Sequence, residues 1–203
     1  MPGRDTYHHG NLREALVEAA AGLIEAHGPQ GFTLTEAARQ AGVSAAAPYR
    51  HFKGREDLLE AVALRGFGLF AERLDQALDS GRPNPLAAFT RLGSCYLQFS
   101  REFPGYYMAM FESGISISGN SDLARVADRA KAVLVRGAEA LAARIPEGER
   151  PPASMVANHI WALSHGVVEL FSRGKPGSRA PYNPEDMLES GVLIYLRGLG
   201  LVR

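Results

Sequence analysis

The sequence predicts an all-α protein of about nine helices, and three observations support this prediction. Apolar residues recur three and four positions apart through most of the chain, which is the spacing of one face of an α-helix. No stretch keeps the alternation of apolar and polar residues that marks a half-buried β-strand. Capping residues, glycines and prolines divide the periodic stretches where helices begin and end.

The first four predicted helices follow from signals near their ends. The first ends at His27-Gly28-Pro29, where a glycine stop is followed by a proline. A second, short helix begins at Thr33, because Thr33 and Glu36 have the spacing of a capping box. Gly42 ends this helix, and Ser44 is the expected N-cap of the third. The four ranges are about 11–27, 33–41, 44–52 and 55–80.

Helix breakers also separate the remaining five helices. The stretch Gly81-Arg82-Pro83-Asn84-Pro85 holds a glycine and two prolines and cannot continue a helix. The segment Lys175–Pro184 is rich in Pro, Gly and Ser, so we predict a loop there. Pro184 then stands near the start of the last helix, where a missing N–H is tolerated. The five ranges are about 85–102, 104–113, 122–145, 152–173 and 184–200.

The composition excludes several classes of protein. The 203 residues carry 22 Lys and Arg against 22 Asp and Glu, which excludes a uniformly basic nucleic-acid coat but not a local basic patch. The single cysteine, Cys95, excludes an intramolecular disulfide framework and a multi-cysteine metal site. No apolar run approaches the ~20 residues of a membrane span. Met1–Asn11 is polar and lacks the apolar core of a signal peptide, so we expect a cytoplasmic protein. We expect no membrane segment, no bound metal and no cofactor.

Residues 33–52 have the pattern of a helix-turn-helix. A short helix that ends at a glycine is followed at once by a capped helix, with Ala41-Gly42-Val43-Ser44 as the turn. Residues 39–55 contain four Lys and Arg side chains and no Asp or Glu. Tyr49 and His51 stand among these cations. This combination suits the phosphate backbone of DNA, although the charge alone would also fit a solvated helix end.

Several short motifs in this region belong together. They are Gly31-Phe32-Thr33, Ala37-Ala38, Ala41-Gly42-Val43-Ser44, Tyr49-Arg50-His51-Phe52 and Asp57-Leu58-Leu59. The chain resembles, over about residues 8–62, the DNA-binding domain of TetR-type transcriptional regulators. It also resembles one subgroup, whose C-terminal domain carries a Trp-x-x-x-His-Gly signature. The subgroup motifs are Tyr7-His8-His9-Gly10-Asn11-Leu12-Arg13, Ala47-Pro48-Tyr49-Arg50-His51-Phe52 and Trp161-Ala162-Leu163-Ser164-His165-Gly166.

The resemblance implies a helix-turn-helix DNA-binding domain at residues 8–54 and an effector-binding and dimerisation domain at 55–203. It implies that the start of the third helix touches base edges and that the flanking residues hold the DNA backbone. A homodimer would then bind a palindromic operator in double-stranded DNA and act as a repressor that a small-molecule effector releases. The implied DNA-binding residues are Thr33, Thr35, Ser44, Ala45, Ala46, Tyr49, Arg50, His51, Lys53 and Arg55.

Pro48 departs from the family pattern, in which an aliphatic residue is usual. It is the fourth residue after Ser44 and lacks the N–H that would make the first helical bond to the Ser44 carbonyl. We therefore expect the third helix to begin loosely or with a shifted first turn. A second departure is Ala45-Ala46-Ala47, which offers methyl groups and no polar side chain.

Aromatic residues and methionines concentrate in residues 99–111. At helical spacing such residues usually form a packed core, and they also suit an apolar pocket for a small molecule. The resemblance favours an effector pocket in the C-terminal domain. The predicted pocket residues are Phe70, Phe103, Tyr107, Phe111, Trp161 and His165.

The last two predicted helices fit an oligomer interface. Both carry apolar residues, and Gly166, Gly191 and Gly198 would allow helices to approach closely. The resemblance implies that these helices form a four-helix bundle between two subunits. A symmetric dimer also matches the symmetry of a palindromic operator.

Two other functions remain open at this point. One is an architectural DNA-binding protein without an effector, which would bind with a steep salt dependence and little sequence preference. The other is a helical enzyme or ligand carrier that uses His165 and Glu169, which are four residues apart on one helix face. The sequence shows no nucleophile with a base and no glycine-rich phosphate loop, so we expect no enzymatic activity.

Overall fold

The computed structural model describes residues 9–172 and 182–202, and these ranges contain eight α-helices, three short 3-10 helices and no strand. The predicted all-α class is therefore confirmed. The start of the Tyr7 motif and most of the predicted loop 175–184 lie outside the described residues. The α-helices are α1 (His9–His27), α2 (Leu34–Gln40), α3 (Arg55–Leu78), α4 (Pro85–Glu102), α5 (Pro104–Phe111), α6 (Ser121–Ala142), α7 (Ala153–Ser172) and α8 (Pro184–Gly198).

The predicted helix 44–52 is the exception to this agreement. In its place the structure has a 3-10 helix, η1 (Pro48–Arg50), whose N-cap residue is Ala47. Ser44 is therefore not the N-cap of an α-helix, and the prediction of nine helices becomes eight α-helices among the described residues. Pro48 accounts for the difference, because the residue has no N–H to donate within the first turn.

The chain divides into two compact units, and helix α3 contributes to both. The N-terminal unit comprises the residues up to Gly68 together with Phe103–Arg125, and the C-terminal unit comprises Leu69–Glu102 and the residues from Val126 onward. This division follows contacts within the chain. The boundary at residues 54 and 55 that the resemblance implies stays a prediction.

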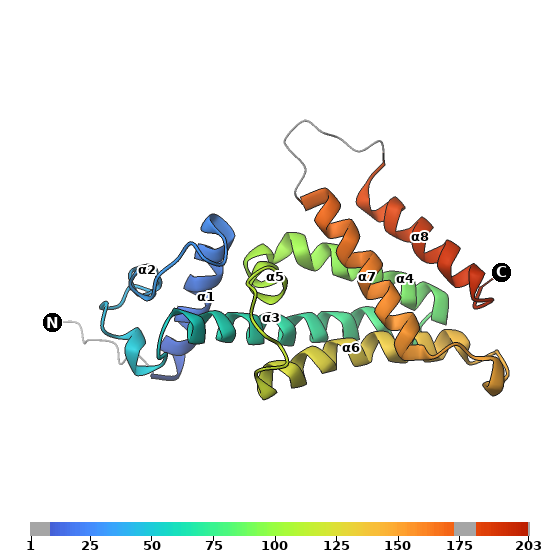
Figure 1. Ribbon diagram of the computed structural model, residues 1–203, viewed down its shortest axis with the longest axis horizontal. Coiled ribbons are helices and arrows are strands. Elements are labelled where there is room, and N and C mark those ends of the chain that lie inside the picture. The colour runs from blue at the N-terminus through green and yellow to red at the C-terminus, as the bar shows by residue number, and fades with distance from the viewer. Residues whose placement is uncertain (1–8, 173–181, 203) are drawn as a thin grey trace. The chain divides into compact units, whose positions relative to one another are not determined.

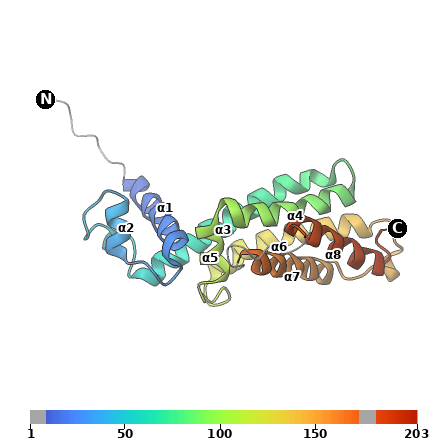
Figure 2. The same cartoon turned by 90° about the horizontal axis from the view of Figure 1, so that it is seen from above.

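In the N-terminal unit, α1 packs against both α2 and α5, and Figure 2 shows α5 beside α1. The core consists of apolar side chains that project inward from α1, α2 and the first half of α3. Their helical spacing follows the pattern that predicted these helices. Fully buried members include Leu16, Ala20, Ile24, Ala37, Ala38, Leu58 and Val62.

In the C-terminal unit, α7 packs against α4 and α8, and α8 also packs against α4. Figures 1 and 2 both show α7 and α8 side by side. The core is aromatic and aliphatic, and includes Phe70, Leu74, Phe89, Leu92, Tyr96, Ile160 and Leu196. Within the described residues, no helix is both long enough and apolar enough to cross a membrane.

Candidate DNA interface

The entry to α2 is fixed by the predicted capping box. The Thr33 hydroxyl oxygen accepts from the Glu36 amide at 3.2 Å, and the Glu36 carboxylate accepts from the Thr33 amide at 2.9 Å. The Thr33 hydroxyl also donates to this carboxylate. Hydrogen bonds from the side chain and backbone of Thr33 hold the pKa of Glu36 below its ordinary value of 4.5. The start of α2 is therefore determined by two residues, Thr33 and Glu36, that are three positions apart.

The turn after α2 is a Schellman motif. Val43 donates its amide to the Ala38 carbonyl at 3.0 Å, and Gly42 donates to the Arg39 carbonyl at 3.1 Å. Gly42 has a φ of +72°, which a residue with a side chain rarely adopts. The predicted role of Gly42 in this turn is thus confirmed. The turn sets the direction of the segment that follows.

The segment after the turn is held by short-range backbone bonds. The Ser44 carbonyl accepts from the Ala47 amide at 3.0 Å, which closes a tight turn with Ala45 and Ala46 at its centre. The Pro48 carbonyl then accepts from the amides of both His51 and Phe52 at 2.9 Å. The bond to the Ser44 carbonyl thus comes from Ala47 instead of Pro48, and a 3-10 helix follows in place of an α-helix with a shifted first turn.

This segment exposes the predicted DNA-contacting side chains. Tyr49 is 63% exposed, which makes it the most exposed large aromatic side chain among the described residues of the N-terminal unit. His51 and Arg55 are half-buried, while Pro48 and Phe52 are buried and anchor the segment to the core. The remaining eight residues that were predicted to bind DNA are all exposed: Thr33, Thr35, Ser44, Ala45, Ala46, Tyr49, Arg50 and Lys53.

Arg55 is engaged within the N-terminal unit. Its guanidinium donates to the Pro29 carbonyl at 2.8 Å and to the Gln30 side-chain oxygen at 2.7 Å, and it lies 5.8 Å from the centre of the Phe32 ring. The Gln30 side-chain nitrogen donates in turn to the carbonyl of Ser113, at 3.2 Å. Sequence reasoning missed Gln30, because its partners lie 25 and 83 residues away. A chain of hydrogen bonds therefore joins the start of α3 to the end of α5.

Helix α5 lies against α1 at very short range. A Cβ on Gly105 would stand 2.0 Å from the Ala21 carbonyl oxygen, so only glycine fits. Nearby, the Tyr106 hydroxyl donates to the Glu18 carboxylate at 2.7 Å. Burial, and then the bond to Glu18, raises the pKa of the Tyr106 hydroxyl well above its ordinary value. Helix α5, although distant in sequence, is thus part of the body that carries the helix-turn-helix.

Comparison with known proteins identifies the family of this chain. Residues 16–62 match the model of bacterial regulatory proteins of the tetR family. Residues 89–194, just over half of the chain, match the model of the tetracyclin repressor-like C-terminal domain. The chain belongs to the TetR family. The Trp-x-x-x-His-Gly subgroup that the sequence suggested stays a prediction.

Three similar proteins illustrate this membership. A protein of unknown function from Rhodococcus sp. RHA1 has 28% identity and a TM-score of 0.79, with 96% of this chain and 98% of that chain covered. AibR, in a complex with isovaleryl coenzyme A and operator DNA, shares the fold with a TM-score of 0.64 at 21% identity, over 90% of this chain and 96% of its own. YobS, an uncharacterized HTH-type transcriptional regulator of Bacillus subtilis, is 25% identical over 100 residues, 49% of this chain and 51% of YobS. The chain therefore spans about half the length of this curated relative.

The exposed segment around Tyr49 is the candidate DNA-reading surface of this TetR-family protein. The predicted effector residues do not all fall in one compact unit. Phe103, Tyr107 and Phe111 belong to the N-terminal unit, where the Tyr107 and Phe111 rings lie 4.9 Å apart. The others, Phe70, Trp161 and His165, belong to the C-terminal unit.

The C-terminal part of this TetR-family regulator contains a cluster of aromatic rings. The Phe70 ring lies edge-to-face against the rings of Tyr96 and Trp161, with 5.2 Å and 5.8 Å between ring centres. The centre of the Phe99 ring lies 4.9 Å from that of Phe70. The Tyr96 hydroxyl is 3.1 Å from Nδ1 of His165. Sequence reasoning left Tyr96 and Phe99 out of the predicted set. The two residues are three positions apart on α4, and this spacing would have predicted that they lie on the same helix face.

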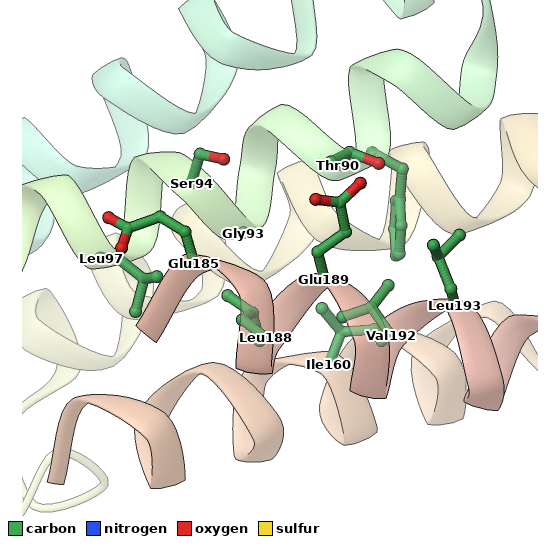
Figure 3. Close-up of a pocket in the computed structure, with 11 residues that line it drawn as sticks. Thr90, Gly93, Ser94, Leu97, Ile160, Glu185, Leu188, Glu189, Val192 and Leu193 are labelled. Carbon is green, nitrogen blue, oxygen red and sulfur yellow. The ribbon is translucent and has the colours of Figure 1, made fainter. Parts of the chain in front are cut away.

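A small groove lies between α4 and α8 in the same unit (Figure 3). The side chains of Glu185 and Glu189 project from α8 toward α4, where Thr90 and Ser94 lie. Glu185 is paired with Arg101 at 2.5 Å, and this pairing lowers the pKa of the Glu185 carboxyl. None of the six predicted effector residues lines this groove. Its lining is Phe89, Thr90, Gly93, Ser94, Leu97, Ile160, Glu185, Leu188, Glu189, Val192 and Leu193.

Helices α7 and α8 expose an apolar surface, which we call the α7–α8 face. Its members follow the spacing of one helix face on each helix. On the surface, Nδ1 of His159 lies 2.7 Å from the Tyr195 hydroxyl and joins the two helices. The face is made of Met155, His159, Ala162, Leu163, Gly166 and Leu170 of α7, and Met187, Gly191, Ile194, Tyr195 and Gly198 of α8.

Proposed function

We propose that this TetR-family regulator is a homodimeric repressor that binds a palindromic operator and releases it when a small molecule binds. The observation that carries the proposal is the segment from Ser44 to Lys53, which we call the reading segment. It exposes Tyr49, Arg50 and Lys53 in a chain with no net charge. Cations beside exposed hydrogen-bonding groups suit phosphates and base edges.

The α7–α8 face supports the homodimer. Leu170 is 66% exposed and Ile194 is 71% exposed, and both lie on this face. Three helical glycines, Gly166, Gly191 and Gly198, have nothing within 4 Å of where a Cβ would stand. A glycine inside a helix costs roughly 0.5–1 kcal/mol relative to alanine, and here no contact within the described chain requires it. A second copy that packs its own helices against these positions would require it.

The contacts of α5 support a response to an effector. Helix α5 lies within the segment that matches the C-terminal domain model, yet it packs on α1 of the DNA-binding region. The hydrogen-bonded chain from Ser113 through Gln30 to Arg55 leads from its end to the residue that begins α3. AibR, which has the same fold, was found with both a coenzyme A ester and operator DNA. A ligand that shifts α5 would therefore bias the position of the reading segment.

The first experiment is selection from a pool of randomised DNA duplexes at near-physiological salt, with wild type and Tyr49→Ala in parallel. We expect the wild type to retain a palindromic sequence and Tyr49→Ala to lose it. Half-sites should lie about 34–36 Å apart along the duplex, since two symmetric reading segments must enter successive major grooves. The recovered duplex then serves to screen small molecules for release.

The other two functions predict different results. An architectural protein would enrich no sequence and would show residual binding with a steep salt dependence. A ligand-processing protein would keep any activity in Tyr49→Ala and lose it in His165→Ala. A palindrome that survives Tyr49→Ala unchanged would contradict the assignment of the reading segment.

A further inference from the structure

The first turn of the reading segment exposes two methyl groups, those of Ala45 and Ala46. Ala45 and Ala46 are the two central residues of the turn that the bond from the Ala47 amide to the Ser44 carbonyl closes. Both are exposed, whereas Ala47 is half-buried and Pro48 is buried. The turn therefore exposes two methyl groups, and the buried Pro48 anchors its C-terminal end in the core.

The surroundings of these methyl groups offer few ways to bond a base through a side chain. Between Ser44 and Tyr49 every residue is alanine or proline, so no side chain there can donate or accept a hydrogen bond. The proline ring fixes φ at Pro48, the residue that directly follows the turn and begins the 3-10 helix. Tyr49 and Arg50 reach out only after the 3-10 turn has begun.

In the major groove, thymine is the base that offers an apolar group. Its C5-methyl group lies on the edge that proteins read, and alanine side chains contact it. Cytosine carries a hydrogen at that carbon, and purines present hydrogen-bonding groups that an alanine leaves unpaired. A pair of exposed alanines in the reading segment thus favours thymine over the other bases.

We propose that each operator half-site carries thymine at the base pairs that Ala45 and Ala46 face, and that the thymine methyl groups provide the discrimination there. The inference rests on the proposed function, because it assumes that the segment enters the major groove of an operator. It adds the chemical class of the sequence that is read. It also assigns Ala45 and Ala46 as specificity-determining residues that act through methyl contact.

The test replaces thymine by uracil, which keeps every base-pairing group and removes only the methyl group. Each thymine in the selected half-site is replaced in turn, and the dissociation constant of the intact protein is measured. We expect about a fourfold loss of affinity at one or two positions, the value that corresponds to burial of one methyl group. Uracil at thymines outside the half-sites should leave the affinity unchanged.

Protein variants then assign the methyl groups. The variants Ala45→Gly and Ala46→Gly remove one protein methyl group each, and each should abolish the uracil effect at one position. Ala47→Gly is the matched control, since it loosens the same turn without removing an exposed methyl group, and it should keep the effect. Circular dichroism melts establish that all three variants are folded.

The outcomes separate this inference from the proposed function. A pool that yields no sequence contradicts the proposed function itself. A clear palindrome without thymine in the half-sites, or with no position sensitive to uracil, leaves the proposed function standing and overturns the inference. Uracil sensitivity that persists in both Ala45→Gly and Ala46→Gly also overturns it, because another residue would then read the methyl group.

Discussion

Helix α5 and the α7–α8 face use glycine in opposite ways. Gly105 of α5 stands where a Cβ would come within 2.0 Å of the Ala21 carbonyl oxygen, so the contact with α1 depends on it. Gly166, Gly191 and Gly198 stand in helices too, but a Cβ at any of them would meet nothing within 4 Å. The first glycine is explained by packing inside the chain, and the other three are not.

The comparison indicates how to recognise a surface that a second molecule covers. Glycine weakens a helix, so a helical glycine usually has a packing or functional reason. Where the reason lies within the chain, as at Gly105, the surroundings are buried. Where the surroundings are open and the neighbouring side chains are apolar, as on the α7–α8 face, we infer that a partner outside the chain packs against the glycines.

The largest effect is expected for Gly105→Ala. The new Cβ would overlap a backbone carbonyl, so α5 must move away from α1, and we expect a loss of about 3 kcal/mol in the free energy of unfolding. For a chain of this size the melting temperature should fall by roughly 10 °C. Gly68→Ala is the control, because its Cβ has open space and alanine favours the helix by roughly 0.8–1 kcal/mol. Equal stability of Gly105→Ala and wild type in urea denaturation would show that this contact is not tight.

Gly191→Leu tests the open glycines. Within one chain the leucine side chain has room, so we expect no loss of secondary structure. In a symmetric dimer the substitution appears twice at the interface, and the overpacking should raise the dimer dissociation constant on the order of 10²-fold. Sedimentation equilibrium measures this constant. Gly148→Leu, also at a glycine with open space but outside the face, should leave the constant unchanged. A dimer that tolerates Gly191→Leu would refute the assignment of the face.

Local signals account for the part of the molecule that was predicted well. The capping box of Thr33 and Glu36, the turn at Gly42 and the disturbance at Pro48 each depend on residues a few positions apart. All eight α-helices agree with predicted ranges to within about three residues. The predicted helix 44–52 was wrong in type, because Pro48, four residues after Ser44, lacks the N–H for the first helical bond, and the spacing of apolar residues does not reveal this loss.

The contacts that were not predicted depend on distant residues. The bond from Gln30 to Ser113 spans 83 positions, and the bond between Tyr96 and His165 spans 69. Hydrophobic spacing indicates that a residue is buried, but not which residue of another helix it meets. The predicted effector set includes Phe70 and Phe103, which belong to different compact units, and it stays a prediction.

Arg55 and Lys53 are both predicted DNA-contacting cations, but the side chain of Arg55 is also bonded within the chain. Arg55 holds Pro29 and Gln30, so Arg55→Gln should lower the free energy of unfolding by about 1–2 kcal/mol. Lys53 is exposed, and Lys53→Gln should leave stability unchanged within about 0.5 kcal/mol. If Lys53 contacts a phosphate, its variant should reduce the salt dependence of operator binding by about one unit of slope. A Lys53→Gln variant with an unaltered salt slope would remove Lys53 from the phosphate-binding set.

The smallest effect concerns the pH dependence of the capping box. The pKa of Glu36 is lowered in the folded chain by its bonds to Thr33, so the folded state binds this proton less readily than the unfolded state does. The stabilisation is therefore fully present above pH 4.5, and it is lost as the pH falls through the lowered pKa. The carboxylate is fully exposed and screened by solvent, so the loss is small. Urea denaturation between pH 7 and pH 3 should show Glu36→Gln less stable than wild type at pH 7, with the difference shrinking toward pH 3. Glu25→Gln, at an exposed glutamate of α1, serves as the control, and a Glu36→Gln difference that stayed constant with pH would exclude the charged form as the stabilising one.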